Sequence, residues 1–238
     1  MIWDMVRSWR MSKAERGNLM THSKPVRVYR WIVFLLAAGY VIRMFVLGGW
    51  DEFAGPLRFL TNWALLLSFV SASRMMALIE GRSTRRWDSL VCTTAVVNAM
   101  VVFLYWRLYF ADPTSVTSNG ELGAWHLEMY LHLLGPVLQI IDSIFVHRSY
   151  RKLGKTALLL VGVVVTYVLW MELFVQRFVD TPAGSVTSGL PYRFLNNQEL
   201  SERMVFYAAN IVVALVFLAV FAAIAWGFKR LFPAPEAP

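Results

Sequence analysis

The chain is poor in cysteine, in histidine and in charged residues. Its 238 residues include one cysteine, Cys92, so an intramolecular disulfide and a cysteine metal cluster are both excluded. Charged residues make up 16% of the chain, against 58% hydrophobic and 15% aromatic residues, and the mean hydropathy is +0.51. So little charge beside so much apolar surface excludes an ordinary soluble domain.

The four histidines are too few and too close together in the sequence to hold a haem or a catalytic metal ion. His22 lies in a basic N-terminal segment, whereas His126, His132 and His147 lie in or next to one apolar run. A bis-histidine haem needs axial ligands on facing helices, and a catalytic zinc needs ligands that one helix does not supply. A transporter would show two repeated halves with paired broken helices, and the chain has no internal repeat. The sequence predicts no cofactor and no metal site.

Six apolar runs are long enough to cross a bilayer as helices, which takes about 20 residues each. They cover residues 29–49, 58–79, 89–110, 125–146, 155–178 and 204–228. The runs do not alternate apolar and polar residues as the strands of a membrane barrel do. Because only helices and closed barrels satisfy the backbone in lipid, the sequence predicts an all-α bundle of six transmembrane helices over residues 29–230.

The two ends of the chain are expected to lie outside this bundle. Residues 1–28 form a basic arm, whose start "MIWDMVRSWRM" fits either a short helix on the membrane surface or a disordered segment. No small-residue cleavage site follows the first apolar run, so we expect that run to be an uncleaved anchor. Residues 231–238 end in "PAPEAP" and are expected to be disordered.

Lysine and arginine are nearly missing from alternate connections between the runs. The first and third connections, which contain "DEFAGP" and "ADPTSVTSNGELGA", have none, and the fifth has only Arg193 and, next to the sixth run, Arg203. The basic residues gather in the arm, the second and fourth connections and the C-terminal end. They are Arg7, Arg10, Lys13, Arg16, Lys24, Arg27, Arg82, Arg85, Arg86, Arg148, Arg151, Lys152, Lys155, Lys229 and Arg230. The positive-inside rule therefore predicts that both termini are cytoplasmic.

The net charge of +8 then reflects topology and contact with anionic lipids. Nucleic acid is not expected as a partner, because the positive charge is scattered over four separate segments. We expect a multi-pass integral membrane protein, in the inner or plasma membrane if the source is a bacterium. Its expected partners are membrane lipids.

Polar residues inside the fourth run are the first candidates for function, because such residues are costly in lipid and usually face the bundle interior. In "WHLEMYLHLLGPVLQIIDSIFV", the helical spacing places Glu128, His132, Pro136 and Gln139 on one face. Asp142 follows His132 by ten residues, or about 15 Å along the axis, which is too far to orient the imidazole.

The second run opens with "RFLTNW", in which Thr61 and Asn62 lie a few residues inside the membrane. The second and fourth runs both enter from the predicted outer side, and His132 lies about 10 Å below Trp125. Thr61 and His132 therefore share one leaflet, and a hydroxyl beside an imidazole is the minimum for nucleophilic catalysis. The alternatives are a capping or packing threonine, an Asn62 that bonds a neighbouring helix, and a structural histidine.

Four short motifs follow one another along the chain: "RFLTNW", "HLLGPVLQIID", "YVLW" at 167–170 and "LPYRFLN" at 190–196. In this order and spacing, the chain resembles the FAR-17a/AIG1-like integral membrane proteins, which include androgen-induced and androgen-dependent membrane hydrolases of animals. The resemblance covers about the first span to the sixth. It implies a threonine hydrolase that cleaves lipid esters, such as fatty acid esters of hydroxy fatty acids. The family threonine matches Thr61 and the family histidine matches His132.

Supporting roles stay open at this point. Glu128 either holds the imidazole, as the third member of a triad does, or points to interfacial water. Asn62 or Asn98 is a candidate donor to the oxyanion, and Asn98 and Asn210 are also candidates for contacts between helices.

Tyr192 and Phe194 belong to an outer connection that either covers the site or anchors the bundle at the interface. The alternative to a hydrolase is a non-catalytic accessory subunit, with a membrane protein as its partner.

Overall fold

The computed structural model describes residues 24–117 and 120–232, and within these ranges it contains helices and no strand. Six helices in this part of the chain are long and apolar enough to cross a membrane, which confirms the predicted fold class. They are Lys24–Leu47 (α3), Leu60–Ile79 (α4), Asp88–Ala111 (α5), Trp125–Val146, Leu153–Phe178 and Leu200–Leu231 (α11).

The first and last spans are longer than predicted. α3 already begins at Lys24, within the predicted arm, and α11 extends from Leu200 to Leu231. A capping box explains the early start of α11: the Glu199 carboxylate accepts from the third helical residue, and Glu202 accepts from the backbone N–H of Glu199. The remainder of the predicted arm, 1–23, and of the predicted tail, 233–238, lies outside the described residues.

The fourth and fifth spans are interrupted by π-helical turns, which the sequence does not reveal. The fourth consists of α6 (Trp125–Met129), the π turn η3 (Tyr130–Leu134), α7 (Gly135–Ile141) and the π turn η4 (Asp142–Val146). The fifth consists of α8 (Leu153–Trp170), the π turn η5 (Met171–Val175) and α9 (Gln176–Phe178). Such turns re-aim side chains and are frequent at functional sites, and η3 contains His132.

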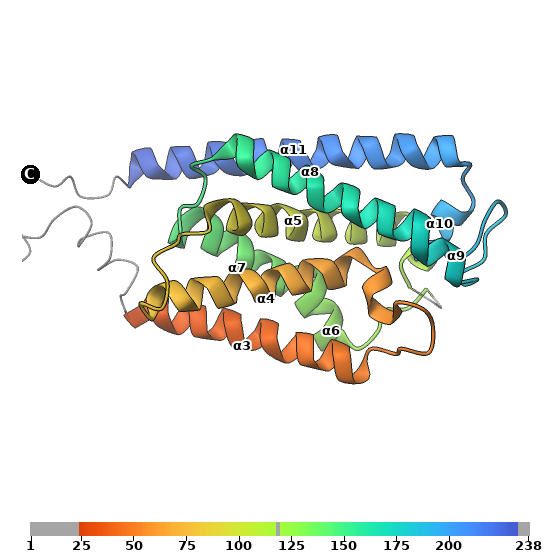
Figure 1. Ribbon diagram of the computed structural model, residues 1–238, viewed down its shortest axis with the longest axis horizontal. Coiled ribbons are helices and arrows are strands. Elements are labelled where there is room, and N and C mark those ends of the chain that lie inside the picture. The colour runs from red at the N-terminus through yellow and green to blue at the C-terminus, as the bar shows by residue number, and fades with distance from the viewer. Residues whose placement is uncertain (1–23, 118–119, 233–238) are drawn as a thin grey trace, which may run out of the picture.

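α5 is the central helix of the bundle. In its most apolar stretch 67% of the residues are buried, against 28% in α3 and 17% in α11. It packs against α4, α7, α8 and α11 (Figure 1), while α3 packs against α4 and α7. Helices in lipid associate through close packing rather than through a hydrophobic effect, so small and branched residues are favoured at their contacts. The "VCTTAVVNAMVV" stretch of α5 supplies such residues.

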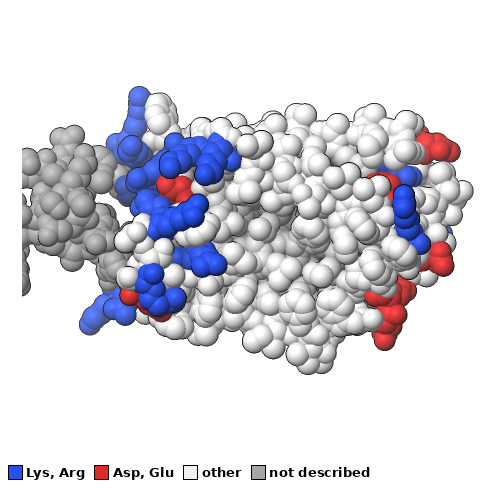
Figure 2. Space-filling model, in the orientation of Figure 1, with Lys and Arg blue, Asp and Glu red and all other residues white. Residues whose placement is uncertain are grey.

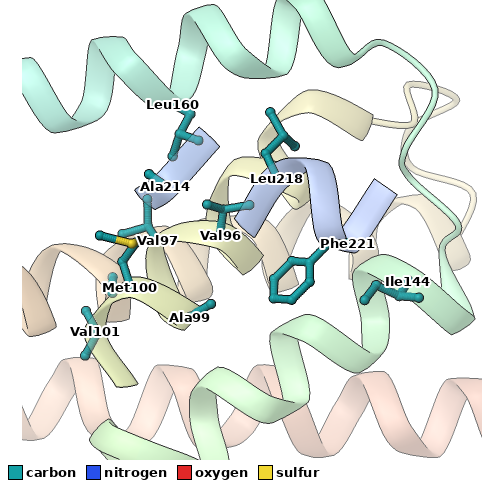
Figure 3. Close-up of a cluster of buried hydrophobic side chains, with 11 residues drawn as sticks. Val96, Val97, Ala99, Met100, Val101, Ile144, Leu160, Ala214, Leu218 and Phe221 are labelled. Atoms are coloured by element: carbon teal, nitrogen blue, oxygen red, sulfur yellow. The ribbon is translucent and has the colours of Figure 1, made fainter. Parts of the chain in front are cut away.

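The largest core cluster surrounds this stretch of α5 (Figure 3). Val96, Val97 and Met100 of α5 meet Leu160 of α8 and Leu218 of α11 there. This packing holds α5, α8 and α11 together beside the cavity described below, so the core fixes the walls of the site.

Charge divides the two ends of the bundle. The start of α3 and the end of α11 lie at the same end (Figure 1), and most lysines and arginines visible in Figure 2 gather there. We call this the basic end; acidic residues gather at the opposite end. The distribution is what the positive-inside rule expects of six spans, and the cytoplasmic location of the termini stays a prediction.

Short helices close the opposite end: η1 (Gly55–Arg58), η2 (Pro113–Ser115) and α10 (Arg193–Asn196). Asn196 organises the connection around α10. Its amide donates to the carbonyls of Pro182 and Leu190, at 2.7 and 2.9 Å, and its Oδ1 accepts from the backbone N–H of Leu190. The 190–196 motif is therefore a loop that is ordered by its own hydrogen bonds and lies over the end of the bundle.

Candidate active site

Thr61 and His132 face each other across two spans. The Thr61 Oγ1 lies 3.4 Å from the His132 Nε2, although the two residues are far apart in the sequence. α4 begins at Leu60, so Thr61 lies in its first turn, and His132 projects from the π turn of the fourth span. The depth argument from the sequence predicts one leaflet for both residues, and the structure adds that their side chains face each other.

Glu128 holds the other imidazole nitrogen. Its Oε2 lies 2.8 Å from the His132 Nδ1, one helical turn away. The same oxygen accepts a hydrogen bond of 2.7 Å from the Tyr105 hydroxyl. A carboxylate only accepts hydrogen bonds, so the Nδ1 of the neutral imidazole must carry the proton. Its Nε2 is then unprotonated and directs a lone pair at the Thr61 hydroxyl.

Two neighbouring aromatic residues of α5 fix His132 further. The Tyr105 ring stacks on the imidazole, with ring centroids 3.5 Å apart and planes 6° from parallel. The Trp106 Nε1 donates to the His132 carbonyl at 2.9 Å. Pro136 has no N–H and leaves this carbonyl without its usual helical donor, and Trp106 replaces that donor.

The sequence did not single out Tyr105 or Trp106. The one available signal was an aromatic pair near the C-terminal end of the third span, and this is also typical of interfacial anchors.

A cavity of about 370 Å³ adjoins the threonine and the histidine. Its walls are mostly apolar and come from α4, α5, α8, α11, the fourth span and the 190–196 loop. The apolar lining includes Val97, Met100, Val101, Leu104, Leu108, Val164, Val168, Phe194, Leu195 and Phe206. No lysine or arginine is among the described residues that line it. A cavity of this size and polarity suits a hydrocarbon chain with one polar group near Thr61.

Asn62 and Trp63 anchor the turn that precedes Thr61. The Asn62 Nδ2 donates to the Pro56 carbonyl at 2.7 Å, and the Trp63 Nε1 donates to the Leu57 carbonyl at 2.9 Å. Both bonds run from the first turn of α4 back to η1. The Pro56 carbonyl also accepts from the Phe59 N–H at 3.1 Å, so Asn62 is its second donor, and the two side-chain bonds fix where α4 begins.

The fifth span secures the same turn from the other side. The Tyr167 hydroxyl donates to the Arg58 carbonyl at 2.9 Å, and the Trp170 Nε1 donates to the Leu57 carbonyl at 3.1 Å. The "YVLW" and "RFLTNW" motifs, distant in sequence, are thus joined by hydrogen bonds directly beside Thr61.

A loop contact outside the spans adds to this support; we call it the loop clasp and define it by Glu52, Arg58 and Thr181. Arg58 pairs with the Glu52 carboxylate, and the Thr181 hydroxyl donates to the Glu52 Oε1 at 2.7 Å. The Thr181 hydrogen bond, with help from Arg58, lowers the pKa of the Glu52 carboxyl. The clasp joins the first and fifth connections next to η1.

The other candidate asparagines take different positions. Asn98 is buried away from the cavity, and its Nδ2 donates to the Ser68 Oγ of α4 and to the Thr94 carbonyl, both at 2.9 Å. Both of its N–H bonds are therefore used within the core. Asn210 does line the cavity, and its Nδ2 donates to the Phe206 carbonyl of its own helix. The expected contact of Asn210 with another helix is therefore not the one observed.

Tyr192 and Phe194 of the 190–196 loop both line the cavity. Tyr192 meets Phe59, which precedes α4, edge to face, with ring centroids 6.1 Å apart. Of the two readings that the sequence left open, this placement favours a cover over the site. Within the described residues, no group of three or more His, Cys, Asp or Glu side chains is arranged to hold a metal ion.

The sequence model of one family, described as FAR-17a/AIG1-like protein, matches residues 28–225. The chain belongs to the FAR-17a/AIG1-like family. No curated protein and no solved structure matches it. The residues that line the cavity of this FAR-17a/AIG1-like chain, Thr61 and His132 included, run from Phe59 to Asn210. The whole site therefore lies inside the matched region, 28–225.

Proposed function

We propose that this FAR-17a/AIG1-like protein is an intramembrane threonine hydrolase of lipid esters, such as fatty acid esters of hydroxy fatty acids. The observation that supports this most strongly is the orientation of His132. Its Nδ1–H is held by Glu128, and its free Nε2 faces the Thr61 hydroxyl at the edge of an apolar cavity. This is the order of contacts that a nucleophile, a base and an orienting acid require.

In the acylation step, the Thr61 Oγ attacks the ester carbonyl carbon while its proton passes to the His132 Nε2. The carbonyl electron pair moves to oxygen and gives a tetrahedral oxyanion. When this collapses, the C–O bond to the alcohol breaks, and the alcohol oxygen takes the proton from Nε2. The distance of 3.4 Å is long for a hydrogen bond, and contacts of this kind shorten when a catalytic site binds its substrate.

In the deacylation step, a water molecule replaces the alcohol and reacts by the same route. It loses its proton to Nε2, attacks the acyl-threonine carbonyl and releases the fatty acid, and Thr61 recovers its proton. In both steps an imidazolium forms transiently. Glu128 is the one acidic side chain among the described residues that line the cavity, and it stabilises that charge directly.

The oxyanion lies near the N-terminal end of α4. Thr61 is in the first turn of that helix, where N–H groups point outward and the helix dipole is positive. Asn62 lines the same cavity, and one N–H of its amide is used on Pro56, which leaves a second for the substrate. Both features stabilise negative charge that develops beside Thr61.

The cavity supports a lipid substrate rather than a soluble one. Apolar residues of α5, α8 and α11 would hold the acyl chain, and the ester group would lie between Thr61 and His132. The absence of lysine and arginine from the described lining favours an uncharged group at the reacting centre. With the basic end cytoplasmic, the site lies in the opposite leaflet, and substrate would enter from the lipid.

Labelling by a fluorophosphonate probe tests the proposal on the purified protein in detergent. The phosphorus of the probe is attacked by an activated hydroxyl, and fluoride leaves. We expect wild type to be labelled, Thr61→Ala and His132→Ala to lose labelling, and Thr61→Ser to retain part of it.

Two matched controls lie outside the cavity. Thr166 is exposed on α8 and bonds only within its own helix, and His126 is exposed at the start of the fourth span. Thr166→Ala and His126→Ala are expected to label as wild type does. A folded wild type that fails under conditions that label an active family member, and that copurifies with a stable membrane partner, would favour an accessory subunit instead.

A further inference from the structure

We propose that Tyr105 is a positioning residue, which holds both Glu128 and the imidazole of His132 in the geometry that catalysis needs. The inference rests on the proposed hydrolase function. Tyr105 is 8% exposed and comes from α5, the central helix, so its own position is set by the best-packed part of the bundle. It makes two different contacts to the Glu128–His132 pair, one through its hydroxyl and one through its ring.

The hydroxyl contact fixes the carboxylate. The Glu128 Oε2 receives two donors, the Tyr105 hydroxyl at 2.7 Å and the His132 Nδ1–H at 2.8 Å. Its Oε1 lies against Gly123, where an added Cβ would come within 3.0 Å of it. Glu128 lies near the outer end of the fourth span and is only half-buried. Without the Tyr105 hydroxyl, its side chain is free to turn toward interfacial water and away from the imidazole.

The ring contact fixes the imidazole. A centroid separation of 3.5 Å with planes 6° apart covers one face of the His132 ring and prevents it from tilting. The imidazolium that forms during each step then lies over the π face of the tyrosine, where a cation is attracted. Trp106 holds the backbone carbonyl of the same histidine, so consecutive residues of α5 grip His132 at its ring and at its main chain.

These contacts predict that the hydroxyl of Tyr105 acts through Glu128. A double-mutant cycle tests this, because independent sites give additive effects and coupled sites do not. The variants are Tyr105→Phe, Glu128→Ala and the double variant, and the measurement is kcat and KM for hydrolysis of a long-chain lipid ester in detergent micelles. Tyr109→Phe is the matched control, since its ring stacks on Tyr105 from the next turn, but Tyr109 does not line the cavity.

We expect Tyr105→Phe to lower kcat about tenfold and to leave KM within about twofold, since it removes part of a contribution from acid–base catalysis. In the Glu128→Ala background the same change is expected to cost less than about twofold. Tyr105→Leu removes the ring contact as well, and should lower kcat further than Tyr105→Phe. Tyr109→Phe should match wild type.

Three results would overturn the inference. Equal costs of Tyr105→Phe in both backgrounds would show that its hydroxyl acts independently of Glu128, as a packing residue would. Wild-type kcat in Tyr105→Phe, with Thr61→Ala inactive, would remove Tyr105 from the mechanism and leave the hydrolase intact. A wild type that neither labels nor hydrolyses would remove the proposed function, and the inference with it. Thermal unfolding of each variant shows whether a low kcat reflects misfolding.

Discussion

His132 and His147 are both buried in or at the end of the fourth span, and both are paired with a carboxylate. The His132 Nδ1 meets Glu128 at 2.8 Å, and the His147 Nε2 meets Asp88 at 3.0 Å. They differ at the second nitrogen. That of His132 faces a threonine hydroxyl and a cavity, whereas that of His147 lies 3.5 Å from the Arg30 guanidinium. A carboxylate partner therefore does not by itself make a reactive histidine.

The surroundings of His147 are those of a structural residue. Its Nε2 lies 2.8 Å from the Arg86 carbonyl, and the Arg86 guanidinium donates to the carbonyl of His147 at 2.7 Å. Arg30 continues the cluster to Asp142 at 3.3 Å. These groups lie toward the basic end and join α3, the start of α5 and the end of the fourth span. All polar positions of the imidazole are used by the protein, so none is available for a substrate.

The largest expected effect comes from replacing each of the two histidines, in separate variants, by glutamine. His132→Gln should lower kcat about a thousandfold or more, because it removes the base, and should change the unfolding temperature little. His147→Gln should do the reverse, lowering stability and leaving the kcat of folded protein near wild type. Hydrolysis assays and thermal unfolding of both variants measure the contrast. Equal losses of activity at equal stability would break the comparison.

A buried charge in the same cluster gives the next effect. Asp142→Ala leaves Arg30 buried without its carboxylate, and removing one partner of a buried pair costs about 3 kcal/mol or more in the free energy of unfolding. Arg30→Met added to Asp142→Ala should recover much of that loss, because no unpaired charge remains. Unfolding in denaturant measures both. Activity of the folded fraction should stay near wild type, since the cluster lies away from the cavity.

The comparison also shows which parts of the site follow from sequence. Span positions follow because apolar length is sufficient evidence for a membrane helix, and the family match and the six spans agree with that prediction. The shared depth of Thr61 and His132 follows from residue counts along a helix axis, whereas the contact between their side chains is seen only in the structure. Their catalytic roles remain a proposal.

Other parts of the site depend on the rotation of each helix about its axis, which depth does not give. Asn98 and Asn210 are both mid-span, yet one faces the core and the other the cavity. The π turn at Tyr130–Leu134 shifts the face that His132 presents, and no sequence pattern marks it. Tyr105 and Trp106 were missed because tyrosine and tryptophan near the end of a span are typical of interfacial anchors, and the sequence does not distinguish such anchors from residues of a site.

Asn98 gives a smaller expected effect, and it tests whether a mid-span asparagine acts in the core or in the active site. Asn98→Leu removes hydrogen bonds to Ser68 and Thr94, and Ser68 keeps its own bond to the Ala64 carbonyl. We expect a loss of about 1 kcal/mol in the free energy of unfolding, in line with polar contacts between membrane helices. The kcat of the folded variant should stay within about twofold of wild type. A large fall in kcat at unchanged stability would instead assign Asn98 to the oxyanion.

The smallest effect is expected at the loop clasp, which lies outside the spans but next to the turn that carries Thr61. The Thr181 hydroxyl and Arg58 lower the pKa of the Glu52 carboxyl in the folded protein. The contact therefore stabilises the loop at pH values above 4.5, the ordinary pKa of the group, and this stabilisation is lost as the pH falls below 4.5 and through the lowered pKa. Glu52→Gln should remove this pH dependence.

Hydrogen exchange of residues 50–58, compared between wild type and Glu52→Gln at neutral pH and at acid pH, measures the effect. We expect the wild-type loop to be the better protected at neutral pH and the difference to shrink in acid. An equal difference at both pH values would mean that the charge of Glu52 does not hold η1 in place, and that the hydrogen bonds from Asn62, Trp63, Tyr167 and Trp170 are sufficient.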